Sequence, residues 1–146
     1  MDIWITIILS LVSLMIGFIA GIYLPQKFRK DDKKPMISVG PFQKRFNLFE
    51  ITNHGGDLLQ LAVAIKWLQD GKEETRTLFN FLNANDNPLR DKPHTPGSLK
   101  RGETKRVCDC PLYSDNGNIE VCVNGQSVDG VHYSRIFNLK NEQKRK

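Results

Sequence analysis

The sequence lacks the motifs of the common enzyme classes. It has neither the G-x-x-x-x-G-K-[ST] loop that cradles nucleoside triphosphates nor the G-x-G-x-x-G turn of dinucleotide-binding folds. Its three histidines, His54, His94 and His132, have no neighbouring Ser, Cys or acid in the pattern of a catalytic triad or a carboxylate pair. We therefore expect no enzymatic activity and no cofactor.

Cysteine is also scarce, with three in 146 residues. Cys108, Cys110, Cys122 and His132 are four candidate zinc ligands, but Cys-x-Cys differs from the wider spacing typical of structural zinc sites. Cys122, in the run IEVCVNG, fits a small buried strand residue. A disulfide between Cys108 and Cys110 would need an oxidising compartment, so we expect reduced thiols and no metal.

Charged residues are absent from Ile3 to Leu24. A helix over this stretch would be about 33 Å long, close to the hydrocarbon thickness of about 30 Å, which predicts one transmembrane helix. Trp4 and Tyr23 stand near its ends, as interfacial anchors do, and we expect Pro25 to end the helix. The competing interpretation, a cleaved secretory signal, needs a basic leader and a shorter apolar stretch.

Lysine and arginine are missing before this segment but frequent after it. Five cations follow within ten residues of Leu24: Lys27, Arg29, Lys30, Lys33 and Lys34. The positive-inside rule then predicts an inner (plasma) membrane protein with its N-terminus outside and its C-terminal domain in the cytoplasm. With Asp2 set aside, 21 basic and 15 acidic residues give the soluble part a formal charge of +6. That charge suits an anionic partner, but also solubility or attraction to acidic lipid.

Bulky side chains are missing from one side of the predicted helix. The small residues there recur at helical spacing: Thr6, Ser10, Ser13, Gly17 and Gly21. In lipid, such residues let two helix backbones approach closely, although they are also common in membrane helices that do not associate. We predict an oligomerisation seam at Ser10, Ser13, Gly17 and Gly21, so that the chain associates with copies of itself in the bilayer.

These patterns divide the chain into four segments: a transmembrane helix (1–25), a basic linker (26–36), a β-rich cytoplasmic domain (37–140) and a basic tail (141–146). The run RFNLFEITN before NHGG predicts a strand that ends in a turn, and LKRGETKRVCDC, NIEVCVNG and VHYSRIFNLK predict three more strands. Residues 83–98 hold three prolines and predict the longest exposed loop.

Residues 57–82 permit two structures. Asp57 is a candidate cap for a short helix near 57–70 that Gly71 would end, whereas alternating apolar residues fit a strand. The pair Asp70-Gly71 is a strong hairpin signal, so we favour two strands. The resulting six or seven strands predict a mainly β fold, a small antiparallel β-sandwich.

The order of FEITNHGG, LKRGETKRV and IEVCVNGQSVDGVHYSRIFNL resembles the immunoglobulin-like β-sandwich domains of many single-pass prokaryotic proteins, over about residues 37–140. The resemblance implies a fold but no activity. Trp67 precedes all three cysteines, so the Cys…Trp…Cys order of antibody-type domains is absent.

Cations cluster in one predicted turn and strand. Arginine and lysine side chains neutralise phosphates, and arginine also stacks on bases. We predict an anion-binding site formed by six cations: Lys44, Arg45, Lys100, Arg101, Lys105 and Arg106. The competing explanation is that these charges face water or protect an edge strand from aggregation.

One helix, a short basic linker and a small basic domain without catalytic residues form a layout that resembles the small membrane effectors of type III CRISPR defence. Over the whole chain, this resemblance implies a symmetric homo-oligomer, such as a tetramer, in antiviral defence. It also implies binding of a cyclic oligoadenylate, typically cyclic tetra-adenylate, that disturbs the helix seam. We expect no binding of long nucleic acid. The alternative is a passive membrane-tethered sandwich that holds a protein partner or acidic lipid.

Overall fold

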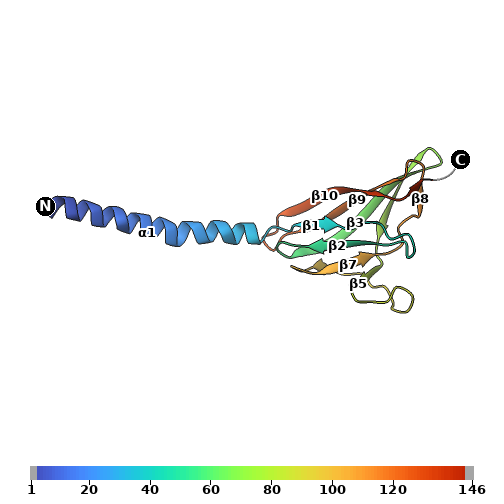
Figure 1. The fold of residues 1–146 in the computed structure, drawn as a ribbon, viewed down its shortest axis with the longest axis horizontal. Coiled ribbons are helices and arrows are strands. Elements are labelled where there is room, and N and C mark those ends of the chain that lie inside the picture. Colours follow the sequence, from blue (N-terminus) through green and yellow to red (C-terminus); the bar gives the residue numbers. More distant parts are fainter. Residues whose placement is uncertain (1–2, 144–146) are drawn as a thin grey trace. The chain divides into compact units, whose positions relative to one another are not determined.

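The computed structural model describes residues 3–143, and within that range it describes all side chains except those of residues 22–32. The chain forms two compact units whose boundary falls between Lys33 and Lys34. The first unit is helical and the second consists of strands (Figure 1).

The first unit contains a single helix, α1 (Ile3–Asp32). Its stretch Ile3–Gly21 has a mean hydropathy of 2.5 and none of it is buried within the chain. The stretch is long and apolar enough to span a membrane, as the sequence predicts.

The prediction that Pro25 ends this helix is wrong. α1 continues to Asp32, so most of the predicted linker is helical. A proline inside a helix removes only one main-chain donor, and long apolar helices tolerate that loss when the surrounding hydrogen bonds persist. The predicted membrane anchor Tyr23 and the cations Lys27, Arg29 and Lys30 lie outside the residues whose side chains are described.

The second unit is mainly β. In the described part of the chain it has eleven strands: β1 (Ile37–Val39), β2 (Phe49–Asn53), β3 (Leu58–Gln69), β4 (Lys72–Leu78), β5 (Phe81–Asn83), β6 (Ser98–Leu99), β7 (Thr104–Val107), β8 (Tyr113–Ser114), β9 (Asn118–Gln126), β10 (His132–Lys140) and β11 (Glu142–Gln143). The helix considered near 57–70 is therefore absent, and β11, which pairs in parallel with β8 in a separate two-stranded sheet, lies in the predicted tail.

The hairpin between β3 and β4 shows why the strand pattern prevails. Alternate apolar residues of β3 are buried: Val63, Ile65 and Trp67. Asp70 and Gly71 both have positive φ, 52° and 75°, as a type I′ turn requires. The Asp115 carboxylate accepts the main-chain N–H of Asp70 at 3.2 Å and of Gly71 at 2.8 Å, which ties the turn to the rest of the domain.

Two antiparallel sheets form the sandwich. The first has the order β1-β2-β7-β5, and the second has the order β10-β9-β3-β4, with β6 paired to the start of β3. This is the arrangement of the immunoglobulin fold, in which strands A-B-E-D form one sheet and G-F-C-C′ the other. The predicted immunoglobulin-like sandwich is confirmed (Figure 1).

One hydrophobic core joins the two sheets. Phe49 and Ile51 of the first sheet and Val63, Ile65 and Val121 of the second all have 0% exposure. Each such side chain contributes roughly 1.5–3 kcal/mol when it leaves water. The core lies entirely within the second unit, so this unit has the apolar contacts it needs to fold by itself.

Candidate functional site

The six predicted ligand-binding cations lie in two separate groups. Lys44–Arg45 precede Leu48, whereas the turn containing Lys100–Arg101 contacts Asn53, whose carbonyl accepts the N–H of Gly102 at 2.7 Å. Leu48 directly precedes β2 and Asn53 ends it, so at about 3.4 Å per residue the two lie about 17 Å apart. Residues 44–45 therefore do not extend a site at residues 100–106.

Lys44 and Arg45 contact other parts of their own chain. The Lys44 ammonium lies 2.9 Å from Glu142 Oε1, and the Arg45 guanidinium lies over the Phe46 ring, 5.2 Å from its centroid. Both cations are exposed, and exposed contacts of this kind contribute at most about 1 kcal/mol.

Strand β7 sends Lys105 and Arg106 to opposite faces of the first sheet. Lys105 is paired with Ile51, a core residue, and Arg106 is paired with Glu50. Directly paired residues of antiparallel strands share a face, so Lys105 points between the sheets and Arg106 points outward. The two neighbours in sequence therefore cannot act on one ligand.

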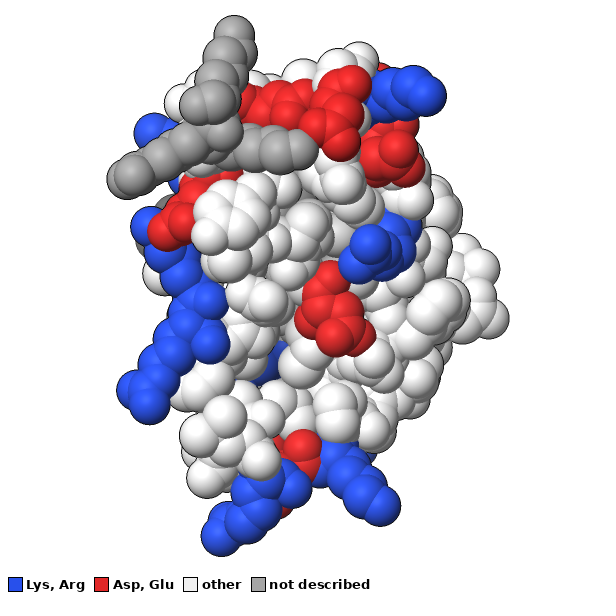
Figure 2. All heavy atoms as spheres, turned by 90° about the vertical axis from the view of Figure 1, so that its right-hand side faces the viewer, with Lys and Arg blue, Asp and Glu red and all other residues white. Residues whose placement is uncertain are grey.

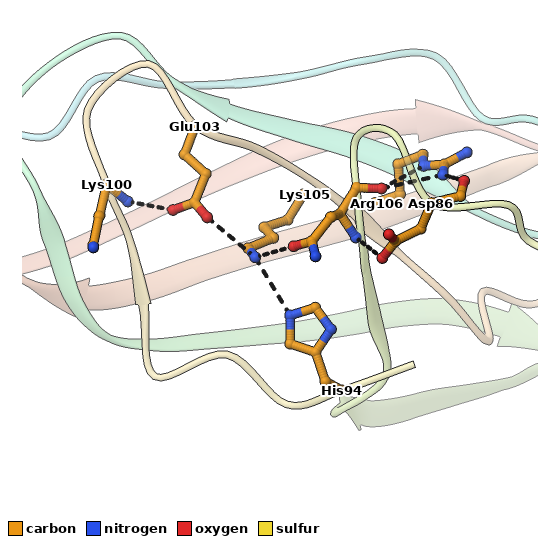
Figure 3. A network of polar contacts seen from close by, with 7 residues as sticks. Asp86, His94, Lys100, Glu103, Lys105 and Arg106 are labelled. Atoms are coloured by element: carbon orange, nitrogen blue, oxygen red, sulfur yellow. Dashed lines mark hydrogen bonds and ion pairs between the residues drawn. The ribbon is translucent and has the colours of Figure 1, made fainter. Parts of the chain in front are cut away.

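Lys105 is the buried centre of a polar network whose other members reach the surface (Figure 3). It is 7% exposed, and its ammonium lies 3.1 Å from Glu103 Oε1 and 3.3 Å from His94 Nε2, with a further hydrogen bond to Asn83 Oδ1. An ammonium has three donors, and these three acceptors satisfy all of them. The bond to His94 requires the ring proton on Nδ1. Lys105 thus acts as part of the scaffold.

Arg106 fixes the start of the long loop after β5. Its guanidinium donates from Nε and from a terminal nitrogen to the Asn83 carbonyl, at 3.3 and 3.1 Å, and also to the Asp86 carbonyl. Its exposed fraction is 9%, so little of it remains for a ligand in water.

Glu103 supplies an internal anion at this site. Partial burial alone would raise its pKa, but the N–H of Lys100, which donates to Oε2 at 2.8 Å, and the ammonium of Lys105 together hold the pKa of Glu103 below its ordinary value. The carboxylate is therefore charged at neutral pH and neutralises Lys105.

The side chains of Lys100 and Arg101 are exposed on the turn between β6 and β7. The turn is held by Asp57, whose carboxylate accepts the N–H of Arg101 at 2.8 Å. The neighbouring residue Gly56 donates its N–H to the Lys34 carbonyl at 2.9 Å. We call the end of the sandwich formed by residues 34–36, 53–57 and 100–103 the entry end, because the chain enters the sandwich there.

Charges elsewhere on the sandwich are dispersed. On the face shown in Figure 2, Lys and Arg side chains are interspersed with Asp and Glu side chains, and one acidic and one basic side chain lie near its middle. This face offers no broad surface of one sign that would attract a large polyanion.

The cysteines have no evident chemistry. All three are free, burial raises the pKa of the Cys110 thiol to about 12, and burial and then the Asp109 charge raise that of Cys108. Thiols with raised pKa values are poor nucleophiles and poor metal ligands. Among residues 3–143, no three His, Cys, Asp or Glu side chains come together to hold a metal ion.

The small-residue side of α1 forms a groove. Thr6, Ser10, Ser13 and Gly17 line it, and a Cβ placed on Gly17 or Gly21 would meet nothing within 4 Å. Ser10 Oγ donates to the Thr6 carbonyl at 2.9 Å. The small residues of the predicted seam thus share one side of α1, where Leu9, Leu14 and Phe18 lie beside them.

We compared the chain with models of known protein families and with curated proteins. No family model matches it, and no curated protein matches it either. Its function must therefore be inferred from its own residues and their geometry.

Proposed function

We propose that the chain is a single-pass membrane protein whose immunoglobulin-like sandwich is a tethered interaction module on the cytoplasmic face of the inner (plasma) membrane. The apolar stretch Ile3–Gly21 supplies the anchor, and the cations that follow it in sequence favour a cytoplasmic sandwich. The seam on α1 supports self-association in the bilayer. The exposed cations of the entry end contact acidic lipid headgroups.

The observation that carries this proposal is the position of Lys100 and Arg101 at the entry end. α1 continues for eight residues past Leu24, a rise of about 12 Å. A headgroup layer is roughly 5–8 Å thick, and the Debye length is about 8–10 Å at physiological salt. The covalent path from Leu24 to the entry end, which begins at residue 34, is therefore short, and this supports contact between these cations and the headgroups.

Binding of residues 34–146 to lipid vesicles tests the contact. Each cation near an acidic surface contributes about 1 kcal/mol, so Lys100→Ala with Arg101→Ala should weaken binding to phosphatidylserine vesicles by about 30-fold. Lys44→Ala with Arg45→Ala removes the same charge about 17 Å from the entry end, a distance that follows from the strand rise of about 3.4 Å per residue. This pair should weaken vesicle binding much less. Equal losses from both pairs, or no preference for acidic over neutral vesicles, would contradict the proposal.

A second candidate function is the binding of a cyclic oligoadenylate messenger, as the resemblance to CRISPR effectors implies. The adjacent exposed side chains of Lys100 and Arg101 favour it, because two neighbouring cations suit a phosphate. Lys105 and Arg106 do not support it, since their donors are bound within the chain. A ligand at 100 times its Kd stabilises a protein by about 2.7 kcal/mol, a shift of several degrees in Tm. No shift with cyclic tetra-adenylate would exclude it as the ligand.

A further inference from the structure

The outer face of the second sheet is open within the described chain. Successive side chains of a strand point to opposite faces of the sheet, and directly paired residues of neighbouring strands share a face. Each residue that is paired with an outward residue therefore also points outward. Apart from two pairs of charged residues near one end, Lys66 with Glu120 and Glu73 with Lys140, the residues on this face are small or uncharged. Along the two central strands, β3 and β9, the outward residues include Ala62, Ala64, Lys66, Leu68, Asn118, Glu120, Cys122 and Asn124.

The register of the four strands arranges these residues in rows across the sheet. One row runs Thr77, Ala64, Cys122, Ile136, and the next runs Thr75, Lys66, Glu120, Asn138. In the next outward row, two residues further along each strand, Glu73 lies on β4 and Lys140 lies on β10. In each charged row, a cation on one half of the face is matched by an anion on the other half.

This pattern is self-complementary under a two-fold rotation. An axis parallel to the strands, midway between β3 and β9, places β3 of one copy over β9 of a second copy and β4 over β10. Lys66 then faces Glu120 of the second copy, and Glu73 faces Lys140 of the second copy. Each contact occurs twice. Corresponding strands of the two copies run in the same direction.

We propose that this face binds a second copy of the chain, so that the sandwiches pair as well as the helices. The uncharged rows support close packing, since Ala62, Ala64 and Cys122 are small and Ile136 is 58% exposed. In a single chain Lys66 forms an ion pair with Glu73, and these side chains are 46% and 54% exposed. When the two copies pair, Lys66 leaves Glu73 and forms an ion pair with Glu120 of the second copy. Glu73 is then available to pair with Lys140 of the second copy.

The small area of the face predicts that the sandwiches pair only when both chains are anchored in one membrane. Four strands about 4.8 Å apart and six residue steps of about 3.4 Å give a projected area of about 400 Å². Stable interfaces bury about 800 Å² per partner, so this face alone supports only weak association. Anchoring in one membrane raises the effective concentration of the sandwiches. The inference therefore rests on the proposed membrane anchoring, and the test uses the full chain in vesicles.

Charge reversal on the full chain tests the pairing. Energy transfer between donor and acceptor labels placed after Lys146 reports the proximity of sandwiches in vesicles. Lys66→Glu and Glu120→Lys should each lower self-association by about tenfold, because each puts like charges in contact at two symmetric positions. Mixing the two variants should restore energy transfer, since every Glu at position 66 or 120 then meets a Lys. If each substitution instead lowered energy transfer by altering the fold of its own chain, mixing the two variants would not restore it.

Two controls keep the outcome unambiguous. Lys92→Glu reverses an exposed charge in the loop after β5 and should leave energy transfer unchanged. Resistance of the protein to extraction at alkaline pH shows separately whether α1 is inserted, which is the premise from the proposed function. Inserted protein whose energy transfer is the same for the native chain, both variants and their mixture would overturn the pairing.

Discussion

Lys105 and Lys66 lie on different sheets of one sandwich and differ in every respect that decides what a lysine does. Lys105 points between the sheets, is 7% exposed and has three acceptors within the chain. Lys66 points outward from the second sheet, is about half exposed and has one ion pair, with Glu73. Burial has made the first a part of the scaffold, whereas the second can exchange partners at little cost.

The largest expected effect comes from truncating the buried lysine. Lys105→Ala leaves Asn83 and His94 without their shared donor and removes the cation facing Glu103. Breaking a buried ion pair costs roughly 3–5 kcal/mol, and we expect about 3 because Glu103 is partly exposed. Lys105→Met keeps the packing volume and should cost clearly less. Urea denaturation at neutral pH measures both, and equal losses would show that packing, not charge, sets the role of Lys105.

Arg106 should have the next largest effect. Arg106→Ala removes the donors that hold the Asn83 and Asp86 carbonyls, so the loop of residues 84–97 should become more susceptible to proteolysis. We expect the free energy of unfolding to fall by about 2 kcal/mol, as for hydrogen bonds to a charged group. Arg106→Lys should not restore it, because an ammonium lacks the planar fork of donors. Arg90→Ala, in the same loop but exposed, is the control, and equal cleavage of both variants would refute this role.

A pH titration should give a smaller effect. The pKa of Glu103 is lowered in the folded protein, so the folded state binds its proton less readily than the unfolded chain does. Its contribution to stability is fully present above the pKa of the unfolded chain and is lost as the pH falls through the lowered folded value. Urea midpoints from neutral to acidic pH should therefore fall less steeply in Glu103→Gln than in the native protein. Parallel curves would mean that Glu103 contributes nothing to acid sensitivity.

Local patterns in the sequence predicted much of the fold. The charge-free run gave α1, and the Asp70-Gly71 turn gave the hairpin, because a turn with two positive φ angles has a strong residue preference. The end of α1 was missed because the rule for proline treats it as a breaker wherever it occurs. The short strands β1, β5, β8 and β11 were missed because strands of two or three residues have no period to detect.

The site was less predictable because its residues meet through strand pairing. Lys105 was placed with Arg106 in one cationic cluster, although a two-residue period already aligns Lys105 with Val107, a core residue. That alternation was the available signal for burial. The partners of Lys105 gave none, since Asn83 and His94 are brought to β7 by pairing with β5 and by the loop that follows. Likewise, the match between Lys66 and Glu120 depends on the register of β3 with β9.

The smallest expected effect on stability separates the two lysines most sharply. Lys66→Ala removes an exposed ion pair, so the free energy of unfolding of residues 34–146 should change by no more than about 0.5 kcal/mol. Energy transfer between full chains in vesicles should nevertheless fall, because two contacts with Glu120 of the second copy are lost. Lys105→Ala should show the reverse, a large loss of stability and, at temperatures where the sandwich stays folded, unchanged association. If Lys66→Ala left association unchanged too, the open face of the second sheet would need a different occupant.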